Sequence, residues 1–154
     1  MDFEDESFDF VWSWGVIHHT PNTSAVIEKI YKLLVPGGQF YMMIYRRFSF
    51  HHLYKILLIN GILKRLLLNM SHQQLLNYCS DRHVPLAQYF SRRQTAKMLE
   101  LFSKVKFQTY EPRQMIVGYL PQNLRNMFDN HFPERLMKFV FSSYGHLLFG
   151  KAVK

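Results

Sequence analysis

The strongest constraint on the fold is a strand, a helix and a second strand that follow one another over residues 8–45. Residues 8–14 are dense in aromatic and β-branched side chains and carry one charge, Asp9, which is typical of a strand covered on both faces. After a loop, Asn22 is placed to cap a helix whose apolar side chains recur at helical spacing up to Pro36. We therefore expect residues 8–14 to form a central parallel strand.

The second strand begins after the turn signal Pro36-Gly37-Gly38, in the apolar run of residues 39–45. A strand, helix and strand in this order almost always make a right-handed crossover, which places both strands in one parallel sheet with the helix on one face. The sequence therefore predicts an α/β fold.

The remaining chain divides into a helical insert, residues 46–90, and a C-terminal part, residues 91–154. In the C-terminal part, Ser91 and Gln94 have the spacing of a capping box at the start of a helix. The other elements that we expect are a helical lid over residues 50–78, a strand at residues 105–110, one or two helices within residues 121–142 and a final strand at residues 146–153.

Composition restricts the kind of protein. The chain has 154 residues and a formal net charge of +8, and its basic residues are dispersed rather than clustered. Its one cysteine, Cys79, excludes an intramolecular disulfide and favours a cytoplasmic location. The most apolar stretch, residues 53–68, is interrupted by Lys55, Lys64 and Arg65, so we expect no transmembrane helix.

Three motifs in order resemble one enzyme family, the class I S-adenosylmethionine-dependent methyltransferases. They are the acidic and aromatic run at residues 3–11, the segment Ser13-Trp14-Gly15-Val16-Ile17-His18-His19 and the segment Leu33-Leu34-Val35-Pro36-Gly37-Gly38. The first two are similar to the fourth-strand motif of that family and the third to its fifth-strand motif. The resemblance implies a Rossmann-like methyltransferase sheet with a helical insert after the second strand present, finished by an antiparallel pair.

The resemblance also implies a site and a cofactor, S-adenosylmethionine. Ligands of open α/β sheets bind beyond the carboxyl ends of the strands. Ser13, Trp14 and Gly15 would line the methionine side of the cofactor, together with His18, and Phe3 would form part of the adenine wall. His19 is the candidate catalytic base. The alternative is that an imidazole of this pair caps the following helix or packs beneath the loop.

The chain departs from the family because no glycine-rich turn and no ribose-binding acid precede these motifs. We therefore expect residues 1–154 to be a partial methyltransferase domain, incomplete at its N-terminal side. Three explanations are open: an incomplete gene product, which we favour, one part of a split enzyme whose other half comes from another chain, or a remnant that kept an altered fold.

Several functions compete. We expect methyl transfer to a small-molecule acceptor chosen by the insert, with catalysis by this chain alone in doubt. A split-enzyme or non-catalytic subunit is the alternative, and so is an RNA-binding methyltransferase remnant, although the dispersed charge argues against nucleic acid. Peripheral membrane contact through residues 50–68 is a weaker alternative. We expect no metal site, because adjacent histidines such as His51 and His52 seldom ligate one ion.

Overall fold

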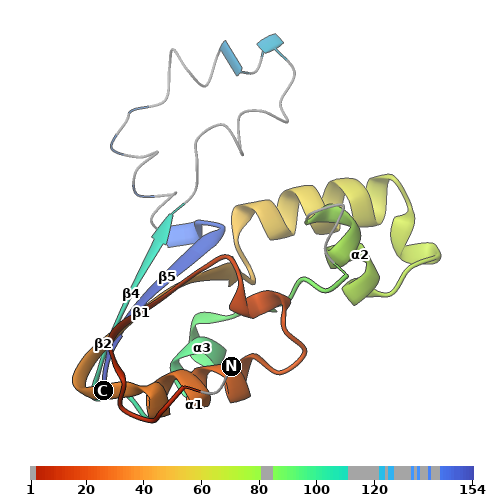
Figure 1. The fold of residues 1–154 in the computed structure, drawn as a ribbon. Coiled ribbons are helices and arrows are strands. Elements are labelled where there is room, and N and C mark those ends of the chain that lie inside the picture. Colours follow the sequence, from red (N-terminus) through yellow and green to blue (C-terminus); the bar gives the residue numbers. More distant parts are fainter. Residues whose placement is uncertain are drawn as a thin grey trace.

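The computed structural model describes residues 3–80, 85–110 and 143–154, together with scattered positions between residues 122 and 139 (Figure 1). The helices expected within residues 121–142 lie outside the described residues. The elements, in chain order, are β1 (Phe8–Trp14), η1 (Ile17–His19), α1 (Thr23–Leu33), β2 (Leu34–Arg46), η2 (His51–Leu63), η3 (Leu66–Leu68), α2 (His72–Cys79), β3 (Tyr89–Phe90), α3 (Arg92–Met98), β4 (Lys104–Tyr110) and β5 (Leu147–Val153).

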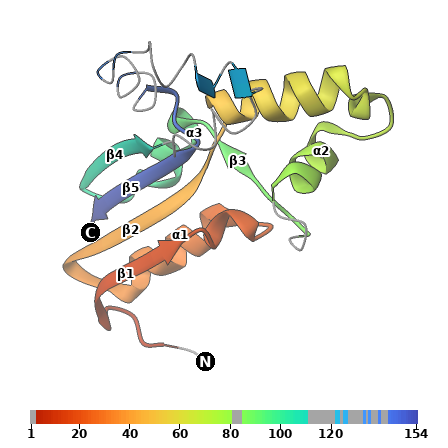
Figure 2. The same cartoon turned by 90° about the horizontal axis from the view of Figure 1, so that it is seen from above.

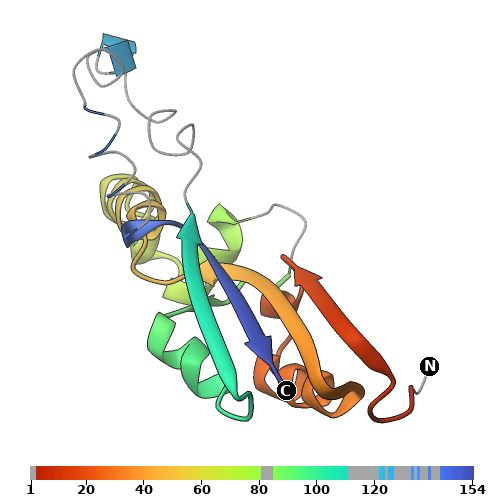
Figure 3. The same cartoon turned by 90° about the vertical axis from the view of Figure 1, so that its left-hand side faces the viewer.

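The strands form one mixed sheet in the order β1-β2-β5-β4, and β3 pairs with β2 beside this path. Strands β1 and β2 are parallel, whereas β5 is antiparallel to both β2 and β4. Figures 2 and 3 show the four long strands side by side with the progressive twist of an open sheet. The α/β class, the parallel first pair and the antiparallel ending are therefore confirmed.

Helix α1 begins where the sequence predicts, because the Asn22 side chain accepts a hydrogen bond from the Ala25 amide at 3.1 Å. It ends earlier than expected, at Leu33, and β2 starts at once and runs through Pro36-Gly37-Gly38. The last residue of the chain explains this continuity: the Gly37 amide donates to the Lys154 carbonyl at 3.1 Å, and the Lys154 amide donates to the Gly38 carbonyl at 3.0 Å. The expected turn is a bulge inside β2: the pairing with β1 passes from Leu34 directly to Gln39, Gly37 has a φ of 81°, and regular pairing begins at Gln39 as predicted.

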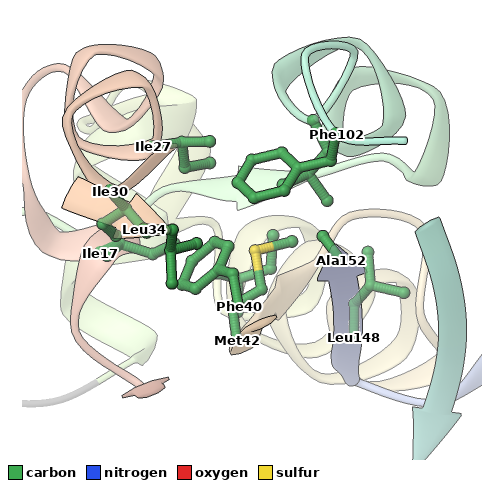
Figure 4. Close-up of a cluster of buried hydrophobic side chains, with 11 residues drawn as sticks. Ile17, Ile27, Ile30, Leu34, Phe40, Met42, Phe102, Leu148 and Ala152 are labelled. Carbon is green, nitrogen blue, oxygen red and sulfur yellow. The ribbon is translucent and has the colours of Figure 1, made fainter. Parts of the chain in front are cut away.

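The main core lies between the sheet and the two helices α1 and α3, which cover the same face (Figure 1). In Figure 4 the side chains of α1 point towards Phe40 and Met42 of β2, with Phe102 above them. The Phe40 and Phe102 rings stack at 5.9 Å between centroids. Buried Leu148 and Ala152 of β5 complete the cluster. One face of the sheet thus carries the stabilising apolar contacts of the fold.

Strand β1 is not the central, doubly covered strand that its composition predicts. It is an end strand of the sheet among the described residues, and its side chains Phe10, Trp12 and Trp14 are 47%, 62% and 53% exposed. They lie on the sheet face opposite α1 and α3, which we call the outer face. No described helix covers the outer face (Figure 1). Aromatic side chains on both faces of a strand indicate that both faces favour burial. They do not show which part of a protein buries each face.

The insert forms a helical hairpin beside the sheet, as the sequence predicts for residues 50–78. Its long helix η2 is a π-helix, and it packs on α2 around Ile56, Leu75 and Leu76. Capping boxes begin both α2, at Ser71, and α3, at Ser91, where one was expected. No helix in the described part of the chain is long and apolar enough to cross a membrane.

Truncating the core on the covered face should destabilise the protein strongly. Ile27 of α1 is fully buried, so we expect Ile27→Ala to lower the free energy of unfolding by about 2–5 kcal/mol through lost contacts and a residual cavity. The measurement is urea unfolding followed by circular dichroism. The control is Val16→Ala, whose side chain is 61% exposed and should change stability by under about 0.5 kcal/mol. Equal losses for both variants would contradict this placement of the core.

Candidate functional site

The carboxyl ends of β1 and β2 meet at one edge of the sheet, as parallel strands require, and the loop after β1 starts there. Gly15 follows β1 with a φ of 69°, a conformation that side chains other than glycine rarely adopt. Its amide donates to the Met43 carbonyl of β2 at 3.1 Å. The Ser13 hydroxyl is buried and has no hydrogen-bond partner among the described residues. The strand end therefore combines a sharp turn with an orphaned hydroxyl.

The loop after Gly15 is held from two sides. The Thr20 and Thr23 hydroxyls both donate to the Ile17 carbonyl, at 2.7 and 3.0 Å. From the segment before β3, the Gln88 amide donates to the His18 carbonyl at 3.0 Å. These bonds fix the short helix η1 between the sheet and the end of the insert, so the two histidines have defined positions.

His19 is half-buried and its ring has a defined tautomer. Its Nδ1 lies 2.6 Å from the Leu86 carbonyl oxygen, which can only accept a hydrogen bond, so Nδ1 carries the proton. In the neutral ring Nε2 is then the basic nitrogen. Asn22, not His19, caps α1. The arrangement is that of a histidine whose backbone partner orients it for proton transfer at Nε2.

His18 lies beneath the loop, fully buried. Its ring contacts those of His19 and Tyr45, each at 4.1 Å between centroids, and neither of its nitrogens has a hydrogen-bond partner among the described residues. Burial, with a smaller contribution from His19, lowers the pKa of His18 to about 3. His18 is therefore neutral at physiological pH.

The structure adds histidines that the sequence analysis did not connect with this site. His146, just before β5, stacks on Tyr45 at 4.8 Å and on His51 of η2 at 4.3 Å between centroids. Burial lowers the pKa of His51 to about 4 and the pKa of His146 well below its ordinary value. The sequence could not assign these histidines to the site, because they lie far from residues 13–19 along the chain. The only signals were their aromatic rings and their positions near the ends of predicted elements.

A histidine pair joins the two helices of the insert. The Phe48 amide donates to Nδ1 of His52 at 3.3 Å, so neutral His52 carries its proton on Nε2. That nitrogen lies 3.3 Å from Nε2 of His72 on α2 and donates to it. Burial, followed by His72 and Arg47, lowers the pKa of His52 to about 4. The pair is matched to neutral rings, because protonated His72 would place two N–H groups face to face.

The structure does not bring Phe3 to this edge. Its ring packs edge-on against Phe8 at 5.2 Å, where β1 begins, while Ser13 to His19 lie where β1 ends. The seven residues of β1 separate the two places by roughly 20 Å. Of the six predicted site residues, Ser13, Trp14, Gly15, His18 and His19 thus lie together, although the Trp14 ring points to the outer face. In the described part of the chain, no group of three or more His, Cys, Asp or Glu side chains is arranged to hold a metal ion.

The N-terminal residues that form this edge of the sheet match known methyltransferases in sequence. Residues 1–42 match the family described as methyltransferase domain. The chain is 46% identical over 43 residues to phosphoethanolamine N-methyltransferase 2 of Caenorhabditis elegans, covering 28% of this chain and 10% of that protein. It is 50% identical over 40 residues to the sterol 24-C-methyltransferase of Candida albicans, covering 26% and 11%. The matched part of the chain thus spans about a tenth of the length of these curated relatives.

The fold comparison extends over the whole chain. A SAM-dependent methyltransferase of Thermotoga maritima superposes with a TM-score of 0.58 at 16% identity, covering 100% of this chain and 59% of that one. At this identity the likeness concerns the fold. The resemblance to class I S-adenosylmethionine-dependent methyltransferases is confirmed, in sequence over residues 1–42 and in fold over the rest.

The buried histidines should make stability depend on pH. A histidine with a lowered folded pKa binds a proton in the unfolded state but not in the folded state between its two pKa values. The stability contribution is therefore present above about pH 7 and is lost as the pH falls towards 4. We expect a loss of about 2 kcal/mol between pH 7 and pH 5 for each of His18, His51 and His52.

Urea unfolding at a series of pH values measures this dependence. His18→Leu removes one such group, so its stability should fall less steeply with acid than that of the parent protein. A variant whose stability follows the parent curve at every pH would show that His18 titrates normally in the folded state.

Proposed function

We propose that this chain, with the methyltransferase-domain sequence over residues 1–42 and the fold of S-adenosylmethionine-dependent methyltransferases, takes part in methyl transfer to a small-molecule acceptor. The observation that carries the proposal is His19, held by the Leu86 carbonyl at the carboxyl edge of the sheet with Nε2 as its basic nitrogen. This edge is where open α/β sheets bind their ligands.

The cofactor contacts that we propose are Ser13, Trp14 and Gly15 on the methionine side. The fit rests on two features of this edge: the buried Ser13 hydroxyl, which has no partner among the described residues, and the absence of a side chain at Gly15. His18 supports this set from below. Phe3 stays a prediction for the adenine end, and a ligand that met both Phe3 and Gly15 would have to extend along β1.

When bound, S-adenosylmethionine would supply an electrophilic methyl group and would keep the electron pair of the broken carbon–sulfur bond. The acceptor's proton passes to Nε2 of His19, while the Leu86 carbonyl keeps Nδ1 protonated. An acceptor with an N–H, O–H or acidic C–H bond fits this scheme, because it has a proton to lose.

For the acceptor we propose a small molecule admitted by the helical insert, which acts as a lid. Both curated relatives are named for small acceptors, phosphoethanolamine and a sterol. The insert reaches the site through His51, which stacks on His146 beside Tyr45. Its inner side therefore bears on the same edge of the sheet as His19.

We also propose that residues 1–154 are part of one methyltransferase domain whose outer face is covered by further polypeptide, in this chain or another. Phe10, Trp12 and Trp14 form a ladder with Phe149 there, with neighbouring ring centroids 5.1 to 6.4 Å apart. Large aromatic patches on proteins mark contact surfaces.

A cytoplasmic location agrees with the single free thiol of Cys79.

Cofactor binding can be tested with S-adenosylhomocysteine. We expect saturable heat on calorimetric titration of the folded chain, and at least a tenfold loss of affinity in Gly15→Val, because a branched side chain strains the turn and occupies the ligand's place. Leu101→Val, at an exposed position three residues after the end of α3, is the control and should bind like the parent protein. A folded parent protein that gives no heat would contradict cofactor binding by this chain.

The role of His19 has its own test. With phosphoethanolamine and a sterol as probe acceptors, His19→Gln should lower kcat by about 10²–10⁴-fold while S-adenosylhomocysteine affinity stays unchanged. The control is His72→Gln, which removes a histidine outside the site. Equal rates for His19→Gln and the parent protein, on an acceptor that the parent methylates, would exclude His19 as the base.

A further inference from the structure

The free end of the helical insert is an aliphatic surface. Ile62 and Leu63 end η2, and Leu67 and Leu68 end η3; their side chains are 61%, 68%, 38% and 77% exposed. Figures 1 and 2 show this end projecting away from the sheet, at the far end of η2. We call these four residues the insert tip. Aliphatic groups held this far out in water are unfavourable for an isolated domain.

The exposed aliphatic surface continues along the outer side of η2. In a helix with i→i+5 hydrogen bonds, residues four or five apart share a side, and Leu53, Leu58 and Ile62 have this spacing. Leu53 and Leu58 are 44% and 40% exposed, whereas Ile56 on the inner side is buried. A hollow of about 420 Å³ runs beside them, lined by Phe50, Leu53, Tyr54, Leu58 and Tyr144. A helix that is apolar on every side belongs in a protein core or in lipid.

The charged residues at positions 46–80, the stretch that contains the insert tip, all have one sign. Residues 29–80 contain no aspartate or glutamate, while residues 46–80 contain five basic residues, Arg46, Arg47, Lys55, Lys64 and Arg65. Lys64 and Arg65 stand in the sequence between the two aliphatic pairs of the tip and are exposed. By contrast, five acidic residues lie within residues 2–9, at the N-terminal end of the sequence. The tip therefore presents apolar groups and positive charge together.

We propose that the insert tip docks into the surface of an anionic membrane. A bilayer can deform around a projecting aliphatic end, so it needs no shaped groove there. Its aliphatic side chains would enter the boundary between headgroups and acyl chains, and Lys64 and Arg65 would remain at the level of the lipid phosphates. Because no described helix can span a bilayer, the contact is at the membrane surface. This proposal does not depend on methyl transfer.

Anionic lipid is the occupant that the charges favour over a covering segment of the protein itself. The covering segment that we propose belongs at the outer face of the sheet, where aromatic side chains lie beside an edge of β1 with no partner strand among the described residues. The insert tip offers neither free strand edges nor aromatic rings. Each basic residue near an anionic bilayer contributes about fivefold to the partition coefficient, so the pair should contribute roughly thirtyfold.

Flotation of the whole chain with lipid vesicles tests the proposal. We expect the protein to float with vesicles of phosphatidylcholine and phosphatidylserine, and much less with phosphatidylcholine alone. Leu63→Gln with Leu68→Gln should lower the partition coefficient at least tenfold, and Lys64→Gln with Arg65→Gln should lower it roughly thirtyfold on the anionic vesicles only. Matched controls are Leu101→Gln, which is 50% exposed beside Glu100, and Lys97→Gln, both outside the insert.

Other outcomes would overturn the proposal. The tip is not a membrane contact if the parent protein floats with neither kind of vesicle, or if both tip variants float like the parent protein. Loss of flotation in Trp12→Ser with Trp14→Ser, with the tip variants unaffected, would assign lipid binding to the outer face. Sedimentation without lipid tests for self-association. If the parent protein is an oligomer, and the leucine variant is a monomer that binds lipid like the parent, the tip is a contact between copies of the chain. Circular dichroism of each variant confirms that it is folded.

Discussion

Strand β2 is the element on which the rest of the structure depends. It is parallel to β1 on one side and antiparallel to β5 on the other, and its end also pairs with β3. Phe40 and Met42 supply the middle of the core under α1, and Tyr45 at its carboxyl end supports the histidines of the candidate site. Because β2 contributes residues to both the core and the site, a change that shifts this strand at the site also disturbs its packing in the core.

The elements that could be predicted from the sequence are those with a local signal. Asn22 marks the start of α1 and Ser91 with Gln94 marks the start of α3, since capping needs only residues three apart. The extent of β2 could not be predicted, because the bonds that carry it through Gly37 come from Lys154, more than a hundred residues later. Proline and glycine marked the bulge correctly, but not that the backbone on both sides of it would be counted in one strand.

The candidate site divides in the same way. Ser13 to His19 could be named together because they are consecutive, and the structure keeps them at one strand end. His51, His52 and His146 could not be assigned, since their contacts depend on how the insert and β5 fold against Tyr45 and Tyr89. Their common burial lowers their pKa values and keeps the rings neutral. His19 differs from them in that its Nδ1 is held by the Leu86 carbonyl, which leaves Nε2 as the basic nitrogen.

Two exposed apolar surfaces remain on the described chain, and their chemistry separates their partners. The outer face combines flat aromatic rings with an edge of β1 that has no partner strand among the described residues, and polypeptide, as we propose, can satisfy both an edge and a flat apolar face. The insert tip has flexible aliphatic side chains around Lys64 and Arg65 and no strand edge, so fluid lipid with anionic headgroups satisfies it without a shaped partner. Since the two surfaces belong to different elements, the polypeptide cover and the membrane contact that we propose do not compete for the same residues.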